Sequence, residues 1–78
     1  MTGKAKGRII NRDSLSAFLE EQVVSGRVAE GSKLPSERAI AEEHGLSRPA
    51  VREALRDLAG RGLVEIVPGR GAYARGPR

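Results

Sequence analysis

The sequence lacks residues on which several classes of protein depend. Among its 78 residues there is no cysteine and no tryptophan, and phenylalanine, tyrosine and histidine each occur once. A chain without cysteine has neither a disulfide framework nor a thiolate that could act as nucleophile or metal ligand. With Phe18 and Tyr73 as the only aromatic rings, a base-stacking platform for RNA or an aromatic-rich protein interface is disfavoured.

The chain also lacks an apolar run of membrane-spanning length and a charged-then-apolar leader. It contains no glycine-rich phosphate loop, no cluster of metal ligands and no nucleophile beside a base, and His44 is better explained as a residue at a helix end. We therefore expect a reduced, cytoplasmic protein that does not associate with membranes, is not an enzyme and needs no cofactor.

Positive charge is concentrated at the two ends of the chain. The net charge is +4, and residues 1–12 and 70–78 together hold seven basic residues and no acidic one. Residues 13–69 hold seven basic and ten acidic residues, which leaves a net charge of −3. We expect a basic flexible arm at 1–9, a folded region at 10–75 and a tail at 76–78. The folded region would then bind a partner through individually placed arginines and not through bulk charge.

The most informative segment is a predicted helix that begins at or near Ser47. Ser47 can accept a hydrogen bond from an unpaired backbone NH, and Pro49 is tolerated in a first turn. One face is apolar, formed by Val51, Ala54, Leu55 and Leu58. The neighbouring face is cationic, formed by Arg48, Arg52 and Arg56.

Two interpretations of this arginine stripe are open. From Arg48 to Arg56 the helix rises ~12 Å, about the width of the major groove of B-DNA, so the stripe fits base edges and backbone. Alternatively, the arginines pair with Glu53 and Asp57 on a solvated helix face. The sequences of the neighbouring segments are needed to choose between these two interpretations.

A shorter helix is predicted just before it. Pro35 favours an extended approach, Ser36 is the expected N-cap, Glu37 suits the first turn, and His44-Gly45 forms a C-terminal stop. Two helices joined by a glycine turn form the helix-turn-helix pattern, whose second helix enters the major groove with its N-terminal residues nearest the bases.

After Gly62 the pattern changes to the strand-like run LVEIV, the turn PGRG and the return AYAR. This predicts an antiparallel hairpin whose first strand is half-buried, with Val64 and Ile66 on one face. Arg70 would lie at its tip. The tip could insert at the minor groove or phosphates, or it could be an ordinary turn with a solubilising arginine.

A first helix precedes these elements and supplies scaffold. Asp13 or Ser14 can cap it, Phe18 is expected in the core, and Gly26 ends it. Residues 27–34 are expected to form a turn and a short strand beside the hairpin. The predicted fold class is α+β, a winged helix-turn-helix of three helices and a small antiparallel wing.

The ordered motifs LPSER (34–38), LSR (46–48), VREAL (51–55), Leu58, GLV (62–64) and GRG (69–71) resemble the GntR family of bacterial transcription regulators. The resemblance covers nearly all of residues 10–74. It implies a winged helix-turn-helix domain that binds palindromic DNA operators as a dimer, and a separate C-terminal domain that binds a small-molecule effector.

By this resemblance, the DNA-binding residues are Arg38, Ser47, Arg48, Pro49, Ala50, Arg52, Gly69 and Arg70. The sequence departs from the family pattern at Ala39, where Glu is common, and at Pro49-Ala50, where some relatives carry threonines.

We expect the arginines to contact different parts of the DNA. A guanidinium can donate two parallel bonds to guanine, and we assign this role to Arg38 and Arg48. Arg52 could reach a base or a phosphate, whereas Arg70 and Lys33 suit phosphates. The alternative for Arg38 is an ion pair with Glu42, four residues further on.

The expected partner is double-stranded DNA, bound at an operator half-site by an isolated monomeric domain and as a homodimer by the full-length protein or on the operator. Acidic residues such as Glu42 and Glu43 would face away from the DNA. Because no effector domain follows the wing, an excised domain is favoured over a naturally short regulator. The competing function is a winged-helix module that docks an acidic protein partner.

Overall fold

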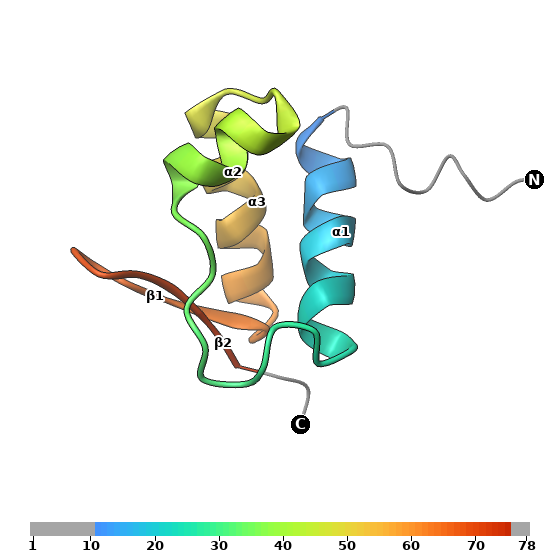
Figure 1. Cartoon of the computed structure of the whole chain (residues 1–78), viewed down its shortest axis with the longest axis vertical. Coiled ribbons are helices and arrows are strands. Elements are labelled where there is room, and N and C mark those ends of the chain that lie inside the picture. Colours follow the sequence, from blue (N-terminus) through green and yellow to red (C-terminus); the bar gives the residue numbers. More distant parts are fainter. Residues whose placement is uncertain (1–10, 76–78) are drawn as a thin grey trace, which may run out of the picture.

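The computed structural model describes residues 11–75, which fold into three helices and one hairpin (Figure 1). The elements are α1 (Arg12–Val24), α2 (Glu37–His44), α3 (Arg48–Gly60), β1 (Val64–Val67) and β2 (Gly71–Ala74). Helices α1 and α3 pack side by side, α2 crosses one end of this pair, and the hairpin extends from the other end. The predicted arm at 1–9 and tail at 76–78 lie outside the described residues.

Side-chain caps set the start of each helix. Ser36 Oγ accepts a hydrogen bond of 3.0 Å from the amide of Ala39, and Ser47 Oγ accepts one of 3.2 Å from Ala50, so both predicted caps are confirmed. The prediction for α1 is wrong. Its cap is Asn11, whose Oδ1 accepts from the amide of Ser14 at 2.9 Å. Asn, Asp and Ser are all good capping residues, and only the one just before the helical turn can reach the unpaired amides.

A short turn centred on Gly45 joins α2 to α3. Gly45 adopts the left-handed conformation, with φ +68°, and its amide donates to the carbonyl of Ala41. The amide of Leu46 donates to the same carbonyl at 3.0 Å. Glycine reaches this conformation without the steric cost of a Cβ, so the chain turns sharply between the two helices.

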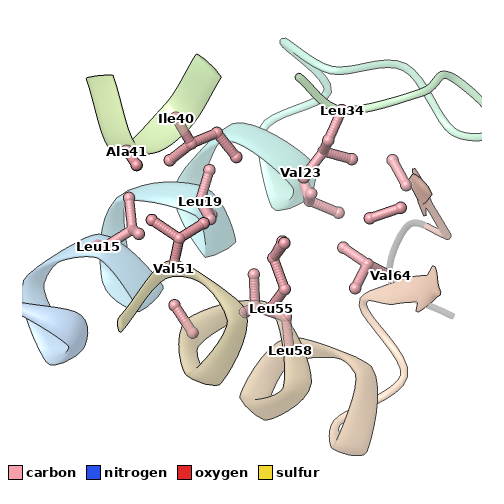
Figure 2. Close-up of a cluster of buried hydrophobic side chains, with 13 residues drawn as sticks. Leu15, Leu19, Val23, Leu34, Ile40, Ala41, Val51, Leu55, Leu58 and Val64 are labelled. Carbon is pink, nitrogen blue, oxygen red and sulfur yellow. The ribbon is translucent and has the colours of Figure 1, made fainter. Parts of the chain in front are cut away.

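The hydrophobic core lies where the three helices and the base of the hairpin meet. Figure 2 shows their apolar side chains pointing toward one another. They are Leu15, Leu19, Val23, Leu34, Ile40, Ala41, Val51, Ala54, Leu55, Leu58, Val64, Ala72 and Ala74. Phe18, expected in the core, is only partly buried at its edge, where its ring meets that of His44 with centroids 5.4 Å apart. Helix α3 buries the apolar face that the sequence predicts, so its arginine face remains open to a partner.

The hairpin is an antiparallel wing. Val64 pairs with Ala74 and Val67 with Gly71, and the amide of Arg70 donates to the carbonyl of Val67 across the turn. The expected alternation holds only at the base: Val64 is buried, whereas Ile66 is 43% exposed. Figure 1 gives the reason, since the outer part of the hairpin projects beyond the helices that could cover it.

The segment before α2 runs beside the wing, as predicted. Lys33 forms an antiparallel bridge with Tyr73, and the amide of Leu34 donates to the carbonyl of Ala72 at 2.8 Å. The pairing is a single bridge and not a full strand. It nevertheless ties the wing to the start of α2, so the two elements hold fixed positions around α3.

Candidate nucleic-acid interface

The arginines of α3 lie on its exposed side, away from the core. The side chains of Arg48 and Arg52 are 60% and 45% exposed, and Arg56 is also exposed. At the start of the helix, Ser47 and Pro49 are exposed and Ala50 is half-buried. The structure therefore brings the predicted residues of α3 together on one accessible surface.

The ion pairs that the alternative interpretation places along α3 do not form. Arg48 and Arg52 instead contact Glu37 on α2: Arg52 Nε and Nη2 donate to its two carboxylate oxygens at 3.2 and 3.3 Å, and Arg48 Nη2 lies 3.9 Å from Oε1. At about 100° of rotation per residue, Glu53 and Asp57 point well away from the arginine face. The interpretation of a solvated helix face is therefore wrong about the acidic residues with which the arginines pair.

Glu53 and Asp57 face α1 instead. Glu53 lies 3.6 Å from Arg12, and Asp57 accepts hydrogen bonds from Ser16 at 2.6 Å and from Arg61 at 3.1 Å. The bond from Ser16 is the main cause that holds the pKa of Asp57 below its ordinary value, and Arg61 adds to it. This polar network links α1 to α3. It does not involve the arginine face of α3, which stays accessible.

Arg61 completes this network. Its guanidinium donates to Glu20 at 3.0 Å as well as to Asp57. The hydrogen bond to Glu20 is the main cause that raises the pKa of Arg61. Arg61 is thus engaged at the α1 side of the domain.

Arg38 lies on α2 and forms the ion pair that the sequence offered as an alternative. Its Nε is 3.3 Å from Glu42 Oε2, four residues along the helix, and both side chains are largely exposed. The expectation that Glu42 faces away from the DNA stays a prediction, since the pairing shows only that its carboxylate lies beside Arg38. An exposed pair of this kind stabilises a helix by only ~0.3–0.5 kcal/mol, so Arg38 can exchange Glu42 for a base or phosphate at little cost.

The wing forms one wall of a hollow of about 180 Å³ beside α3. Arg52 and Arg56 line it from α3, and Ile66 and Gly71 line it from the wing. The tip residues Gly69 and Arg70 are exposed. The arginine face of α3 and the wing thus flank one surface.

Gly71 adopts a backbone conformation that favours glycine. Its φ is +125°, and a Cβ at this position would lie 2.9 Å from Cε of Lys33. The Lys33 side chain therefore lies across the start of β2. A cation predicted to meet phosphate thus lies beside the turn end of the wing.

Within residues 11–75, no group of three or more His, Asp or Glu side chains is arranged to hold a metal ion. None of the helices in this range is long and apolar enough to cross a membrane.

Three helices, a two-stranded wing and arginines exposed along the third helix define a winged helix-turn-helix protein. The sequence model for the bacterial regulatory proteins of the gntR family matches residues 11–74. The chain therefore belongs to the gntR family.

Individual relatives agree. The chain is 55% identical over 47 residues to the HTH-type transcriptional regulator Mce2R of Mycobacterium tuberculosis, covering 60% of this chain and 20% of that protein. It is 38% identical over 60 residues to the mannosyl-D-glycerate transport/metabolism system repressor MngR of Escherichia coli, covering 77% of this chain and 25% of that protein. The chain thus spans 20–25% of the length of these relatives.

A solved structure with the same fold contains DNA. The crystal structure of AraR(DBD) in complex with operator ORR3 superposes with a TM-score of 0.78 at 25% identity, covering 81% of this chain and 76% of that chain. Its similarity confirms the winged-helix fold of this chain.

Proposed function

We propose that this domain binds double-stranded DNA sequence-specifically and thereby regulates transcription. The observation that carries the proposal is the exposed arginine face of α3, which begins at a capped helix N-terminus and lies beside the wing. Helix α3 would enter the major groove, and the wing would contact the minor groove or the backbone. The repressor MngR and the operator complex of AraR(DBD) support this function over docking to an acidic protein.

Base reading is assigned to the arginines whose side chains can leave their present partners. Arg48 and Arg38 are the leading candidates, because both are exposed and their ion pairs are weak. Each guanidinium could donate two parallel bonds to guanine, worth ~1–3 kcal/mol of discrimination. Arg52 would act from a more constrained position, one helical turn after Arg48.

The remaining site residues are proposed to position the domain on the DNA and to shape the surfaces that approach it. Ser47, Pro49 and Ala50 lie at the helix start, where small side chains allow α3 to approach the base edges closely. Arg70 would meet a phosphate from the tip of the wing, and Lys33 would meet one from beside the start of β2. Gly69, with φ +76°, would keep the tip narrow.

The whole protein is proposed to act as a homodimer on a palindromic operator, with one such domain on each half-site. A further region that binds a small-molecule effector would control this binding, and the protein would act on the bacterial chromosome in the cytoplasm. The relatives are transcriptional regulators, so we assign this domain no catalytic step.

The test is selection of duplexes from a random library, followed by affinity measurements at several salt concentrations. We expect one motif to be enriched, and log K to fall against log salt with a slope near −3.6 for ~4 phosphate contacts. Arg48→Ala should weaken binding to the selected duplex by about 1–3 kcal/mol. The matched control is Arg27→Ala, which removes an exposed arginine from the loop after α1. No enriched motif, or equal effects of the two variants, would refute the proposal.

A further inference from the structure

Glu37 places a carboxylate between two arginines of the recognition helix. Its oxygens accept hydrogen bonds from Arg52 Nε and Nη2 at 3.2 and 3.3 Å, and Oε1 lies 3.9 Å from Arg48 Nη2. The Glu37 side chain is 29% exposed, less than either arginine. The carboxylate therefore lies beneath the guanidinium groups that it contacts.

The contact leaves a defined edge of Arg52 free. A guanidinium is planar and carries five N–H donors. Glu37 occupies the side formed by Nε and one N–H of Nη2. The end of the group, with one N–H each on Nη1 and Nη2, remains available as a pair of parallel donors. Guanine O6 and N7 accept such a pair.

The carboxylate sits on a rigid support, whereas the arginine alone would be mobile. Glu37 is the first residue of α2, where the helix dipole favours a negative charge, and Ser36 caps the same turn. Ile40 and Ala41 anchor α2 in the core. A long arginine side chain loses rotamer freedom when it is ordered, and an ordered group has less to lose on binding DNA.

The same carboxylate disfavours DNA in general. A negative charge at a surface facing phosphates repels every duplex and offsets part of the charge of Arg48 and Arg52. It therefore lowers sequence-independent affinity, while the oriented Arg52 retains its contact with the correct base. Both effects increase the ratio of specific to non-specific affinity.

We propose that Glu37 is a specificity-determining positioning residue, which aims the free edge of Arg52 at a base and suppresses non-specific binding. This rests on the proposed function, in which α3 reads the major groove. If the ion pair only stabilised the packing of α2 against α3, its loss would change the unfolding temperature and leave sequence discrimination unchanged.

The test uses the 78-residue chain, the duplex that it selects, every single-base-pair variant of that duplex and a scrambled duplex. Glu37→Gln should raise affinity for the scrambled duplex about fivefold and reduce discrimination at one base pair about tenfold. Glu37→Asp keeps the charge but withdraws the carboxylate by one methylene. It should reduce discrimination at the same base pair and leave affinity for the scrambled duplex unchanged.

The control is Glu43→Gln, which removes a carboxylate from the same helix. Among residues 11–75, Glu43 Oε1 lies 4.0 Å from His44 Nε2, and Glu43 forms no ion pair with an arginine. Discrimination between base pairs by Glu43→Gln should equal that of the wild type. Thermal unfolding is measured to check that each variant is folded. Should Glu37→Gln not fold, Glu37→Asp decides the proposal.

Arg52→Lys separates this proposal from the function on which it rests, because lysine cannot donate a planar pair of bonds. If Arg52→Lys and both Glu37 variants lose discrimination at the same base pair, the proposal holds. If only Arg52→Lys loses it, Glu37 has no positioning role and the DNA-reading function stands. If Arg52→Lys keeps full discrimination, Arg52 reads no base and the proposal falls. If no duplex is enriched at all, the proposed function fails together with it.

Discussion

The hydroxyl of Ser16 on α1 donates a 2.6 Å hydrogen bond to the carboxylate of Asp57 on α3, across 41 positions of sequence. The bond crosses the interface between the two longest helices, on the side away from the arginine face. It makes the packing of α1 against α3 depend on an ionised carboxylate. The arginine face of α3 is thus opposed, on the other side of the helix, by a titratable contact that holds α3 against α1.

Stability should fall in acid because of Asp57. The pKa of Asp57 in the folded chain lies below its ordinary value of 3.8, chiefly through the bond from Ser16. The stabilisation is therefore complete above that value and is lost as the pH falls through the folded pKa. Thermal unfolding from pH 7 to pH 2 should show this loss in the wild type.

Asp57→Asn should unfold at a lower temperature at pH 7 and should lose less on acidification than the wild type. Asp13→Asn, which removes an exposed carboxylate near the start of α1, serves as the control for loss of a charge. An Asp57→Asn protein whose unfolding temperature drops with pH as steeply as that of the wild type would show that this contact does not matter.

Leu15→Ala should be strongly destabilising. Leu15 is completely buried between the helices (Figure 2). Truncating such a side chain costs about 2–5 kcal/mol, a large share of the stability of a small domain. Urea denaturation measures this directly. Val24→Ala, at a half-exposed position of the same helix, should change stability by less than about 1 kcal/mol. Equal costs at the two positions would mean that the core is elsewhere.

Two glycines offer a matched test of the turn between α2 and α3. Gly45→Ala introduces a Cβ at φ +68° and should cost about 1–2 kcal/mol, although the site is sterically open. Gly60→Ala, at the end of α3 and equally open, should be neutral or stabilising by up to about 1 kcal/mol. Urea denaturation of both variants checks this pair. The opposite order would contradict the assigned helix boundaries.

The wing tip should act on affinity and not on sequence preference. Arg70→Ala should weaken binding to the selected and scrambled duplexes by similar factors, and should reduce the salt slope by about 0.9, the contribution of one phosphate contact. Titrations at several salt concentrations give the slope, and Arg27→Ala should leave it unchanged. An unaltered slope for Arg70→Ala would mean that the tip is an ordinary turn.

Local sequence signals predicted much of this fold. Ser36 and Ser47 mark the starts of α2 and α3, Gly45 marks the turn, and the spacing of Val51 and Leu55 identifies the buried face of α3. These signals suffice because capping and helical periodicity involve residues only a few positions apart.

Features that depend on the relative placement of elements could not be predicted in this way. The contact of Glu37 with Arg52 spans 15 positions and depends on how α2 crosses α3. The exposure of Ile66 depends on how far the wing extends past the helices, and the place of Phe18 at the core edge depends on where the end of α2, at His44, meets α1. Asn11 was missed for a local reason, since several capping residues stand close together and periodicity does not choose among them.

The central claim is that Arg48 reads a base from the start of α3. The most direct measurement is a double-mutant cycle with wild type and Arg48→Ala. Each protein is titrated with the selected duplex and with duplexes in which one guanine at a time is replaced by 7-deazaguanine. We expect the missing N7 acceptor to weaken binding by the wild type at one guanine by about 1 kcal/mol or more, and to have no further effect on Arg48→Ala at that position. Equal losses in both proteins at every guanine, or a selected duplex without guanine, would contradict the claim.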